Sequence, residues 1–335
     1  MTDAKKVVVV GGGYGGVAVA KTLDDVADVV LVEPRETFVH NVAALRAMVD
    51  PEWPERLFIP YDGLLNRGRV HHDWAVRVSA DRVELAGGAV LPADFVVLAT
   101  GAVYPFPGKP GPADPDWFAA TRRSLLAAGS ILLVGAGPIG LDLAGEIKSA
   151  WPEKRVTVAG RSPVLMPGFP DEFRRELTDQ LSALGVELRL GITADQAGPH
   201  DFTFDSFGTP PDTGYLDPAL AGARDAGGRL TVTPELRLPG VPTVFAVGDV
   251  TAVPEMKTAR IAGLHADIVA ANIRSLIDGD GGLKTYTAAP DAIVLTLGPH
   301  AGVSYIPGTG VLGPGPTAEI RADYRLAEYR LLLGA

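Results

Sequence analysis

A glycine-rich run near the start of the chain limits the possible folds more strongly than any other part of the sequence. It extends from Lys5 to Gly16 with the letters KKVVVVGGGYGG. Val7 to Val10 form a β-branched stretch of strand length, which is typical of a strand buried on both faces of a parallel sheet. Gly11 allows a tight turn, Gly13 leaves no Cβ against a pyrophosphate, and Gly16 lets the following helix pack close to the sheet. The run therefore predicts a strand, a phosphate-binding turn and a helix.

An acidic residue stands twenty positions after Gly13 and completes this pattern. Val29 to Val32 predict a second strand, and Glu33 at its end is placed to accept hydrogen bonds from a ribose hydroxyl. The helix N-terminus near Tyr14 supplies unpaired N–H groups and the positive end of a dipole to the phosphates. Because strand, glycines, helix and acid occur in this order, we predict a dinucleotide site rather than only a tight turn.

The chain has 335 residues, which exceeds one ordinary core, so two or three domains are expected. Hydrophobic residues make up 47% and charged residues 21% of it, as in soluble globular proteins. No apolar stretch is long enough to span a bilayer, and the first strand leaves no room for a signal peptide. We therefore expect a cytoplasmic protein, with weak peripheral membrane contact left open and the oligomeric state not predicted.

Net charge and cysteine content exclude several classes of function. The formal charge of -10 argues against nucleic acid and anionic membrane surfaces as main partners, because both would repel the protein. The absence of cysteine excludes disulfide frameworks, thiolate metal sites, cysteine nucleophiles and a redox-active disulfide. The six histidines have no spacing that indicates a metal site, and we expect none. We expect His71 and His72 to be a solvated hairpin pair, and His265 to be a packed helix residue rather than a proton donor.

The segment after the first acid contains candidates for further cofactor contacts. Asn41 to Arg46 predict a short helix. Arg35 and Asn41 either reach a flavin or are solvated loop residues, and both interpretations stay open. Val76 lies in a predicted hairpin with the strand Arg82 to Leu85, and it is included among the cofactor-binding candidates.

A further buried strand is predicted from Asp94 to Thr100. It ends at Thr100 and Gly101, and in a flavoprotein with two dinucleotide domains such an end marks the crossing to the next domain. A plain β-turn is the alternative. The prolines from Pro105 to Pro115 then form a connector that can continue neither a helix nor a strand.

A second dinucleotide unit repeats the first. Ser130 to Val134 predict its strand and Leu141 to Lys148 its helix. The residues expected to contact a nucleotide there are Gly135, Gly137, Pro138, Ile139 and Asp142. After the second strand, Val156 to Ala159, the position that matches the first acid holds Gly160, and Arg161 follows it.

This exchange bears on the coenzyme. An acid at that position holds the ribose hydroxyls of NADH and repels a 2′-phosphate, so its loss removes the main discrimination against NADPH. Arg161 is placed to pair with that phosphate, unless it points to solvent. We therefore expect NADPH to be accepted at least as well as NADH.

The chain then leaves this unit. Asp171 is expected to cap a helix that ends at Gly185, and Val186 to Leu190 predict a strand. Thr203 to Gly208 resemble a degenerate version of the first crossing at Thr100 and Gly101. We expect this stretch to return the chain to the first domain.

The return brings a third signal, the strand Thr243 to Val247 followed by Gly248 and Asp249. The Asp249 carboxylate is expected to lie beside the first glycine turn and to hold the ribityl and pyrophosphate region of FAD. A long helix is predicted from Met256 to Ile277. Thr258 and Lys257 in its first turn are candidates for contact with the flavin pyrimidine, and Lys257 for a catalytic electrostatic role. A solvated lysine is the alternative.

The end of the chain, from Asp291 to Ala335, predicts a small unit of strands and a last helix. Ala292 to Leu297 have strand character, and Thr317 to Leu333 have helical composition. Three residues of this unit, Tyr305, Ile306 and Tyr329, either line a quinone entrance or only pack the unit against the first domain.

Four stretches make the chain resemble a known family. They are FVHNVAALRA at Phe38 to Ala47, LATG at Leu98 to Gly101, PFPGK at Pro105 to Lys109, and ARIAGLHADIVAANI at Ala259 to Ile273. The chain is similar to FAD-dependent pyridine nucleotide oxidoreductases of the apoptosis-inducing factor and type II NADH dehydrogenase family, above all to its ferroptosis suppressor branch. The resemblance implies FAD on the first domain, NAD(P)H on the second, and a quinone that takes electrons from reduced flavin.

Two departures from the family pattern bear on the nucleotide domain. The stretch from Ile192 to Gly208 is shorter and more polar than the corresponding strands, which puts the edge of the sheet in question. Asp142 stands where related chains often have Glu, which puts the positioning of the nicotinamide in question.

The expected fold class is therefore α/β, with two Rossmann-like dinucleotide-binding domains, the second inserted in the first, and a small C-terminal α+β unit. The expected boundaries are 1–113 and 221–285 for FAD, 114–220 for NAD(P)H, and 286–335 for the C-terminal unit. The expected function is transfer of a hydride from NAD(P)H to flavin and of electrons to a quinone-type acceptor. The alternatives are a flavin-binding redox sensor and a reductase of a small iron–sulfur protein. Partners of the latter kind are usually acidic, so the charge of this chain disfavours it.

Overall fold

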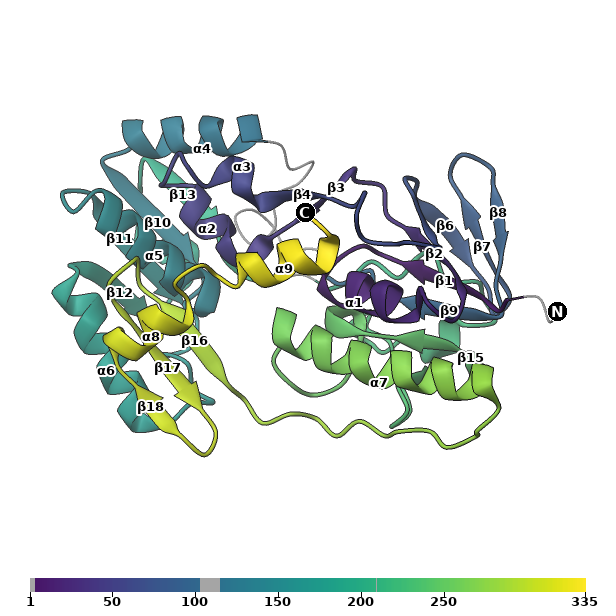
Figure 1. Ribbon diagram of the computed structural model, residues 1–335. Coiled ribbons are helices and arrows are strands. Elements are labelled where there is room, and N and C mark those ends of the chain that lie inside the picture. Colours follow the sequence, from purple (N-terminus) through teal and green to yellow (C-terminus); the bar gives the residue numbers. More distant parts are fainter. Residues whose placement is uncertain (1–3, 103–114, 209) are drawn as a thin grey trace.

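A computed structural model of the protein describes residues 4–102, 115–208 and 210–335, which form two lobes (Figure 1). The first lobe is built on a six-stranded sheet with the order β14-β15-β9-β1-β2-β5, in which only the β14–β15 pair is antiparallel. Its strands are β1 (Lys6–Val10), β2 (Asp28–Val32), β5 (Arg69–His71), β9 (Phe95–Leu98), β14 (Arg237–Leu238) and β15 (Val241–Ala246).

The valines of β1 explain why this strand is central. Val7 and Val9 face one buried cluster and Val8 and Val10 face another, so both faces of the strand are covered. The helices α1 (Tyr14–Leu23) and α7 (Ala259–Asp278) pack against each other and lie side by side in Figure 1. The other cluster includes residues of a small antiparallel sheet of β6 (Ala75–Val78), β7 (Arg82–Leu85) and β8 (Val90–Pro92).

The rest of this part of the chain is made of short elements. They are the hairpin-like pair β3 (Thr37–Val39) and β4 (Phe58–Pro60), a 3-10 turn at Asn41–Ala43, α2 (Ala44–Ala47) and α3 (Pro54–Leu57). The short helix expected after the first acid is therefore present.

The second lobe repeats the centre of the first. Its four-stranded parallel sheet has the order β12-β11-β10-β13, so β10 lies between β11 and β13 as β1 lies between β2 and β9. The elements are α4 (Pro115–Ala127), β10 (Ser130–Val134), α5 (Pro138–Ala150), β11 (Arg155–Gly160), α6 (Asp171–Ala183), β12 (Val186–Leu190) and β13 (Phe202–Asp205), with a 3-10 turn at Ala194–Ala197. Two further 3-10 turns, at Ala221–Ala223 and Gly248–Val250, pack in the first lobe. The polar stretch from Ile192 to Gly208 had left the edge of this sheet in question. It contains a strand, β13, which forms that edge.

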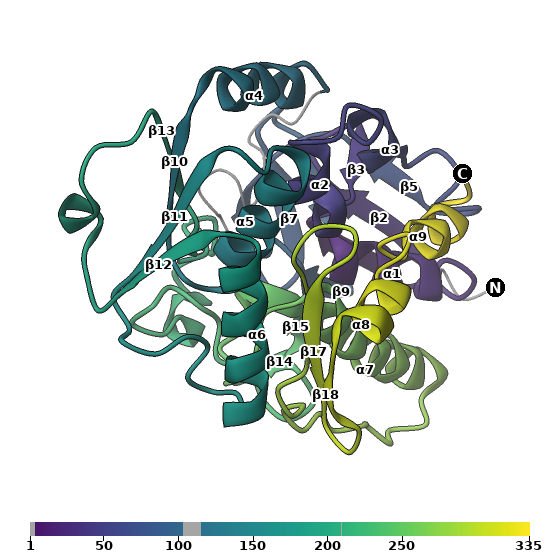
Figure 2. The same ribbon diagram turned by 90° about the vertical axis from the view of Figure 1, so that its left-hand side faces the viewer.

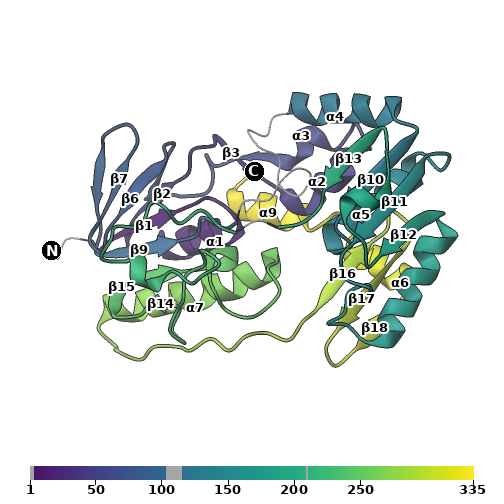
Figure 3. The same cartoon turned by 180° about the vertical axis from the view of Figure 1, so that it is seen from behind.

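The C-terminal strands β16 (Ile293–Thr296), β17 (Gly302–Ile306) and β18 (Gly310–Leu312) form an antiparallel sheet beside α5 and α6 of the second lobe (Figure 2). The segment between α7 and β16 spans the distance between the two lobes, as Figures 1 and 3 show. After α8 (Pro314–Ile320) the chain crosses back, and α9 (Leu326–Leu333) packs on the first lobe.

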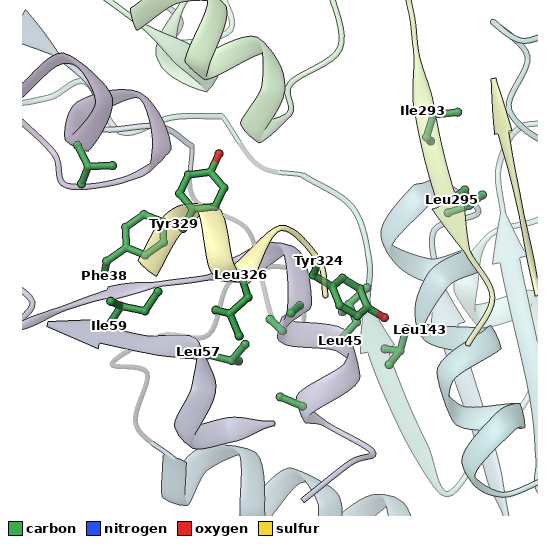
Figure 4. Packing of buried hydrophobic residues seen from close by; sticks show 14 of the residues in the cluster. Phe38, Leu45, Leu57, Ile59, Leu143, Ile293, Leu295, Tyr324, Leu326 and Tyr329 are labelled. Carbon is green, nitrogen blue, oxygen red and sulfur yellow. The ribbon is translucent and has the colours of Figure 1, made fainter. Parts of the chain in front are cut away.

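This return crossing corrects the prediction of one helix from Thr317 to Leu333. The helix is interrupted because Tyr324 and Arg325 have left-handed backbone angles, with φ of 54° and 62°. Tertiary contacts hold this corner: Tyr329 stacks near Phe38, and Leu326 lies over Leu57 and Ile59 in Figure 4.

Three smaller predictions also need correction. Asp171 is the first residue of α6 and not its cap, since Pro170 occupies the N-cap position. α7 begins at Ala259 rather than Met256, and Thr258 caps it by accepting a hydrogen bond from Ile261 N–H. His71 ends β5, which pairs with β2 in parallel and forms no hairpin there, and the His72 ring lies within hydrogen-bond distance of the Glu33 carbonyl.

The α/β fold class predicted from the sequence, with two Rossmann-like units, is confirmed, and in each unit a glycine turn follows the central strand, β1 or β10. The expected domain boundaries stay a prediction. The prolines between 105 and 114 lie outside the described residues. Among the residues that the structure describes, no helix is long and apolar enough to cross a membrane.

Candidate functional site

A cavity of about 2210 Å³ lies between the lobes and reaches both glycine turns. Most residues predicted to bind cofactors line it, and Gly16 and Arg161 do not. Those that line it are Gly11, Gly13, Tyr14, Glu33, Arg35, Asn41, Val76, Thr100, Gly101, Gly135, Gly137, Pro138, Ile139, Asp142, Gly248, Asp249, Lys257 and Thr258. The structure thus brings the two repeats and the return signal to one space.

Three glycines with different structural roles shape the first turn. Gly11 has φ of 104°, and a Cβ there would lie 2.5 Å from the Ala99 carbonyl oxygen. A Cβ at Gly16 would overlap the carbonyl oxygen of Gly11, so this glycine serves helix packing as predicted. At Gly13 a Cβ would meet nothing within 4 Å, although the residue faces the cavity. The space left open there, in front of the N-terminus of α1, suits a pyrophosphate.

Glu33 closes β2 beside this turn, and its side chain is 4% exposed. Its carboxylate accepts hydrogen bonds from Gly12 N–H at 2.7 Å and from Arg35 Nε at 2.7 Å. Burial opposes ionisation, but these bonds outweigh it and hold the pKa of Glu33 below its usual value. The acid is therefore charged and oriented at the edge of the cavity, where a ribose can compete for its oxygens.

The second turn copies this geometry. Gly135 has φ of 124°, and a Cβ there would lie 2.7 Å from the Ser206 carbonyl oxygen. A Cβ at Gly140 would overlap the carbonyl oxygen of Gly135, and Gly137 is open like Gly13. The cradle fits a second dinucleotide. A Cβ at Gly160, however, would lie only 2.7 Å from Ala136 Cβ, and Arg161 is exposed.

The crossings and the return also reach the cavity. The Thr100 and Tyr215 hydroxyls are 2.8 Å apart, which ties the first crossing to the segment after the second. Gly248 has φ of 73° in the turn that carries Asp249. Lys257 Nζ donates to the Val253 carbonyl at 2.8 Å, and burial lowers its pKa despite the acids nearby.

Two acids on α5 form ion pairs with other parts of the molecule. Asp142 lies 3.6 Å from Arg321 of the C-terminal segment, and Glu146 lies 2.7 Å from Arg46 of α2. The Tyr324 hydroxyl donates to Glu146 at 3.0 Å. Burial, opposed by Arg321, raises the pKa of Asp142 to about 7. Its Oδ1 has no hydrogen-bond partner among the described residues.

An aromatic cluster joins the first glycine turn to α9. The Tyr14 hydroxyl accepts a hydrogen bond from Val42 N–H at 3.0 Å and lies 3.3 Å from His40 Nδ1. The other ring nitrogen of His40 is 2.9 Å from the Tyr324 carbonyl oxygen, which makes it the donor there. Burial lowers the pKa of His40 to about 4, so the ring is neutral. Tyr329 packs edge-on against Tyr14, with ring centroids 4.9 Å apart.

Of the three C-terminal candidates, Ile306 and Tyr329 line the cavity, whereas Tyr305 packs edge-on against Phe169. Sequence reasoning missed Tyr215, Arg321 and Tyr324, which also line the cavity. No local motif marks them, because each reaches the site only through the tertiary fold.

Comparison with known protein families matches residues 5–266 to the pyridine nucleotide-disulphide oxidoreductases. Apoptosis-inducing factor homolog B of Dictyostelium discoideum is 29% identical, over 96% of this chain and 94% of its own length. Ferroptosis suppressor protein 1 of Mus musculus is 30% identical, over 92% and 90%.

Solved structures show the same fold. The sulfide:quinone oxidoreductase of Aquifex aeolicus has a TM-score of 0.79 at 19% identity, over 99% of this chain and 92% of that one. NDH2 of Plasmodium falciparum in complex with NADH has a TM-score of 0.77 at 12% identity, over 98% and 95%.

The resemblance predicted from the sequence is thereby confirmed, and the two glycine cradles fit the cofactors that it implies. The chain belongs to the pyridine nucleotide-disulphide oxidoreductase family and is a flavoprotein enzyme that uses FAD and NAD(P)H.

Proposed function

We propose that the protein is a FAD-dependent NAD(P)H:quinone oxidoreductase, which transfers a hydride from NAD(P)H to flavin and then electrons to a quinone-type acceptor. The observation that supports this most directly is the cavity, which joins both glycine turns to an apolar wall from the C-terminal segment. The name of the Aquifex aeolicus neighbour also specifies a quinone as its acceptor.

The absence of cysteine narrows the route of the electrons. The family name includes a disulphide, but this chain has no cysteine and so no dithiol to reduce. Glutathione-reductase and thioredoxin-reductase chemistry is therefore excluded, and electrons must pass directly to a diffusible acceptor.

The wall formed by the C-terminal segment suits a flat apolar acceptor. Its apolar residues at the cavity include Ile293, Val294, Leu295, Ile306, Ile320 and Tyr329. Val42 and Leu45 of the first lobe line the cavity too. The transfer of a quinone ring from water to this apolar wall would cost little free energy.

Bound FAD supplies the redox chemistry, and the protein orients the two dinucleotides. Gly13 and Gly137 make room for pyrophosphates at the N-termini of α1 and α5. Asp249 would hold the ribityl region, and Lys257, half-buried at the cavity, would favour negative charge near the flavin pyrimidine. Asp142 can hold or release a proton at Oδ1 near neutral pH.

For the coenzyme we propose that NADPH is accepted at least as well as NADH. The contact between Gly160 and Ala136 supports this, because it leaves no room for an acid that would repel a 2′-phosphate. Arg161 is exposed beside that position, so its guanidinium is free to turn toward such a phosphate.

An anaerobic titration with each nicotinamide, followed by a panel of quinones, tests the proposal. We expect bleaching of the flavin by NADPH and by NADH, and recovery of its colour on addition of quinone. A reduced protein that no quinone reoxidises would contradict the proposal and favour a sensor or an iron–sulfur partner.

Two matched variants test the acceptor wall. Ile306→Ala should raise the KM for quinone by about tenfold and leave flavin reduction by NADPH unchanged, since about 1.4 kcal/mol of apolar contact is removed. Leu312→Ala, on the neighbouring strand but outside the cavity lining, should change neither. Equal effects of both variants would argue against the wall.

A further inference from the structure

The His265 side chain of α7 is fully buried, and both of its ring nitrogens form hydrogen bonds. Nδ1 accepts a hydrogen bond from Gly248 N–H at 3.0 Å. This leaves the proton on Nε2, which donates to Glu255 Oε1 at 2.7 Å. Burial lowers the pKa of His265 despite the acid beside it, so the ring is neutral and this tautomer is fixed. The imidazole therefore connects the turn at Gly248 to Glu255.

Glu255 uses its second oxygen on a different part of the chain. Oε2 accepts hydrogen bonds from the Tyr286 hydroxyl at 2.6 Å and from Ala289 N–H at 2.9 Å. The Tyr286 ring also packs edge-on against His265, with centroids 4.4 Å apart. The Glu255 side chain is 1% exposed, so a carboxylate in this place depends on these donors.

The position of Glu255 in the chain gives this network a bearing on the cofactor. It lies between two stretches that line the cavity, namely Gly248–Asp249 and Met256–Thr258. Tyr286 and Ala289 belong to the segment that connects α7 to β16 and spans the two lobes (Figures 1 and 3). One buried side chain thus joins α7, the turn of Asp249 and the connecting segment.

We propose that Glu255 is a positioning residue of the FAD site. It holds the Asp249 turn through His265, and it holds the loop of Lys257 against the connecting segment through Tyr286 and Ala289. The proposal rests on the flavin cofactor of the family and not on the identity of the acceptor. Its tests therefore measure FAD affinity without quinone turnover.

Glu255→Gln is the first test. The new amide oxygen can still accept from His265, but the amide nitrogen cannot accept from Tyr286 and Ala289. We expect the dissociation constant of FAD to rise by about tenfold or more, because hydrogen bonds to a charged group are lost. It is measured by flavin fluorescence during reconstitution of the apoprotein. An unchanged constant would overturn the proposal.

Tyr286→Phe removes one hydroxyl and serves where the first variant fails to fold. We expect a smaller loss, about threefold to tenfold in FAD affinity. Its control is Ser275→Ala, which removes the hydroxyl that donates to the Gly282 carbonyl at 3.0 Å and so holds the same connecting segment without touching Glu255. Equal losses in both variants would overturn the proposal.

Two further measurements separate positioning from general stability. The double variant Glu255→Gln, Tyr286→Phe should bind FAD no more weakly than Glu255→Gln alone, because both changes break one network. Thermal unfolding should show a smaller gap between holoprotein and apoprotein in Glu255→Gln. An equal fall in both midpoints, with additive effects on FAD affinity, would show a purely structural role.

Discussion

The two glycine turns of this chain have the same backbone geometry and different polar chemistry. In both, the first glycine has a left-handed φ and lies against a carbonyl oxygen at the end of a neighbouring strand, and the last lies against the first. In the first unit, however, Gly12 N–H donates to Glu33, whereas Ala136 and Gly160 take these two positions in the second unit.

The exchange is sterically reciprocal. A Cβ at Gly12 would lie 2.8 Å from Glu33 Cγ, and a Cβ at Gly160 would lie 2.7 Å from Ala136 Cβ. Each unit therefore holds one side chain in a space that cannot hold two. The comparison predicts that the glycines provide for dinucleotide binding in both units, while the pair behind them sets which ribose each unit prefers.

The largest effect is expected where a side chain would overlap the backbone. Gly16→Ala and Gly140→Ala each force a helix away from its turn, at a cost of about 1–3 kcal/mol or more. Gly16→Ala should lose FAD and stability together. Gly140→Ala should keep its yellow colour and lose reduction by NAD(P)H. Flavin content and Tm measure this, and loss of FAD in both variants would contradict the separation of the two units.

The next effect isolates the phosphate cradles. Gly13 and Gly137 have φ of -77° and -96°, which alanine adopts freely, and a Cβ there meets no protein atom within 4 Å. We expect the apoprotein of each variant to unfold within about 0.5 kcal/mol of the parent.

Binding should change in these two variants while stability does not. Gly13→Ala should weaken FAD and Gly137→Ala should weaken NAD(P)H, each by more than about tenfold, which corresponds to about 1.4 kcal/mol. Reconstitution with FAD and the KM for the coenzyme provide the readouts. Unchanged binding in either variant would place the pyrophosphate elsewhere.

A smaller effect is expected from the polar difference between the two units, namely Arg161 beside Gly160 where the first unit has Glu33. Arg161→Ala should lower kcat/KM for NADPH by about tenfold and leave NADH unchanged, because a charge-assisted hydrogen bond to the 2′-phosphate is lost. Steady-state kinetics with both donors decide this. Equal losses for the two coenzymes, or none, would reject the role of Arg161.

The smallest effect is a difference in pH dependence between the acids of the two units. The pKa of Glu33 lies below its ordinary 4.5, so its contribution to stability is present above pH 4.5 and is lost as the pH falls through the folded value. The pKa of Asp142 rises from 3.8 to about 7, so the folded state loses stability as the pH rises from about 4 to 7.

Substitution should remove each dependence separately. Glu33→Gln should flatten the fall in Tm below pH 4.5, and Asp142→Asn should flatten the fall between about pH 4 and 7. Thermal unfolding of the apoproteins across this range is the measurement. Parallel profiles for parent and variants would contradict the assigned directions.

Local sequence was sufficient for the parts of the site that depend on backbone sterics. Gly11, Gly16 and Gly135 are required by contacts within their own strand–turn–helix units or with a neighbouring strand end, so the spacing alone predicts them. The turn at Gly248 could likewise be predicted from local sequence, because it directly follows a recognisable apolar strand.

Long-range contacts account for what the sequence did not reveal. Tyr215 meets Thr100 across 115 positions, and Tyr324 meets Glu146 across 178. The corner at Tyr324 also interrupts a stretch of helical composition, because the ring is held between the lobes by residues far away in sequence. No local periodicity encodes such a constraint.

The contact between Ala136 and Gly160 bears on how the coenzyme preference of such an enzyme can evolve. An acid introduced at Gly160 while Ala136 is present would crowd the turn before it could serve a ribose. Replacing Ala136 by glycine first opens the space and leaves the backbone path intact. We therefore expect an acid at position 160 to be tolerated only after Ala136 has been replaced by glycine, so that the order of the two mutations matters.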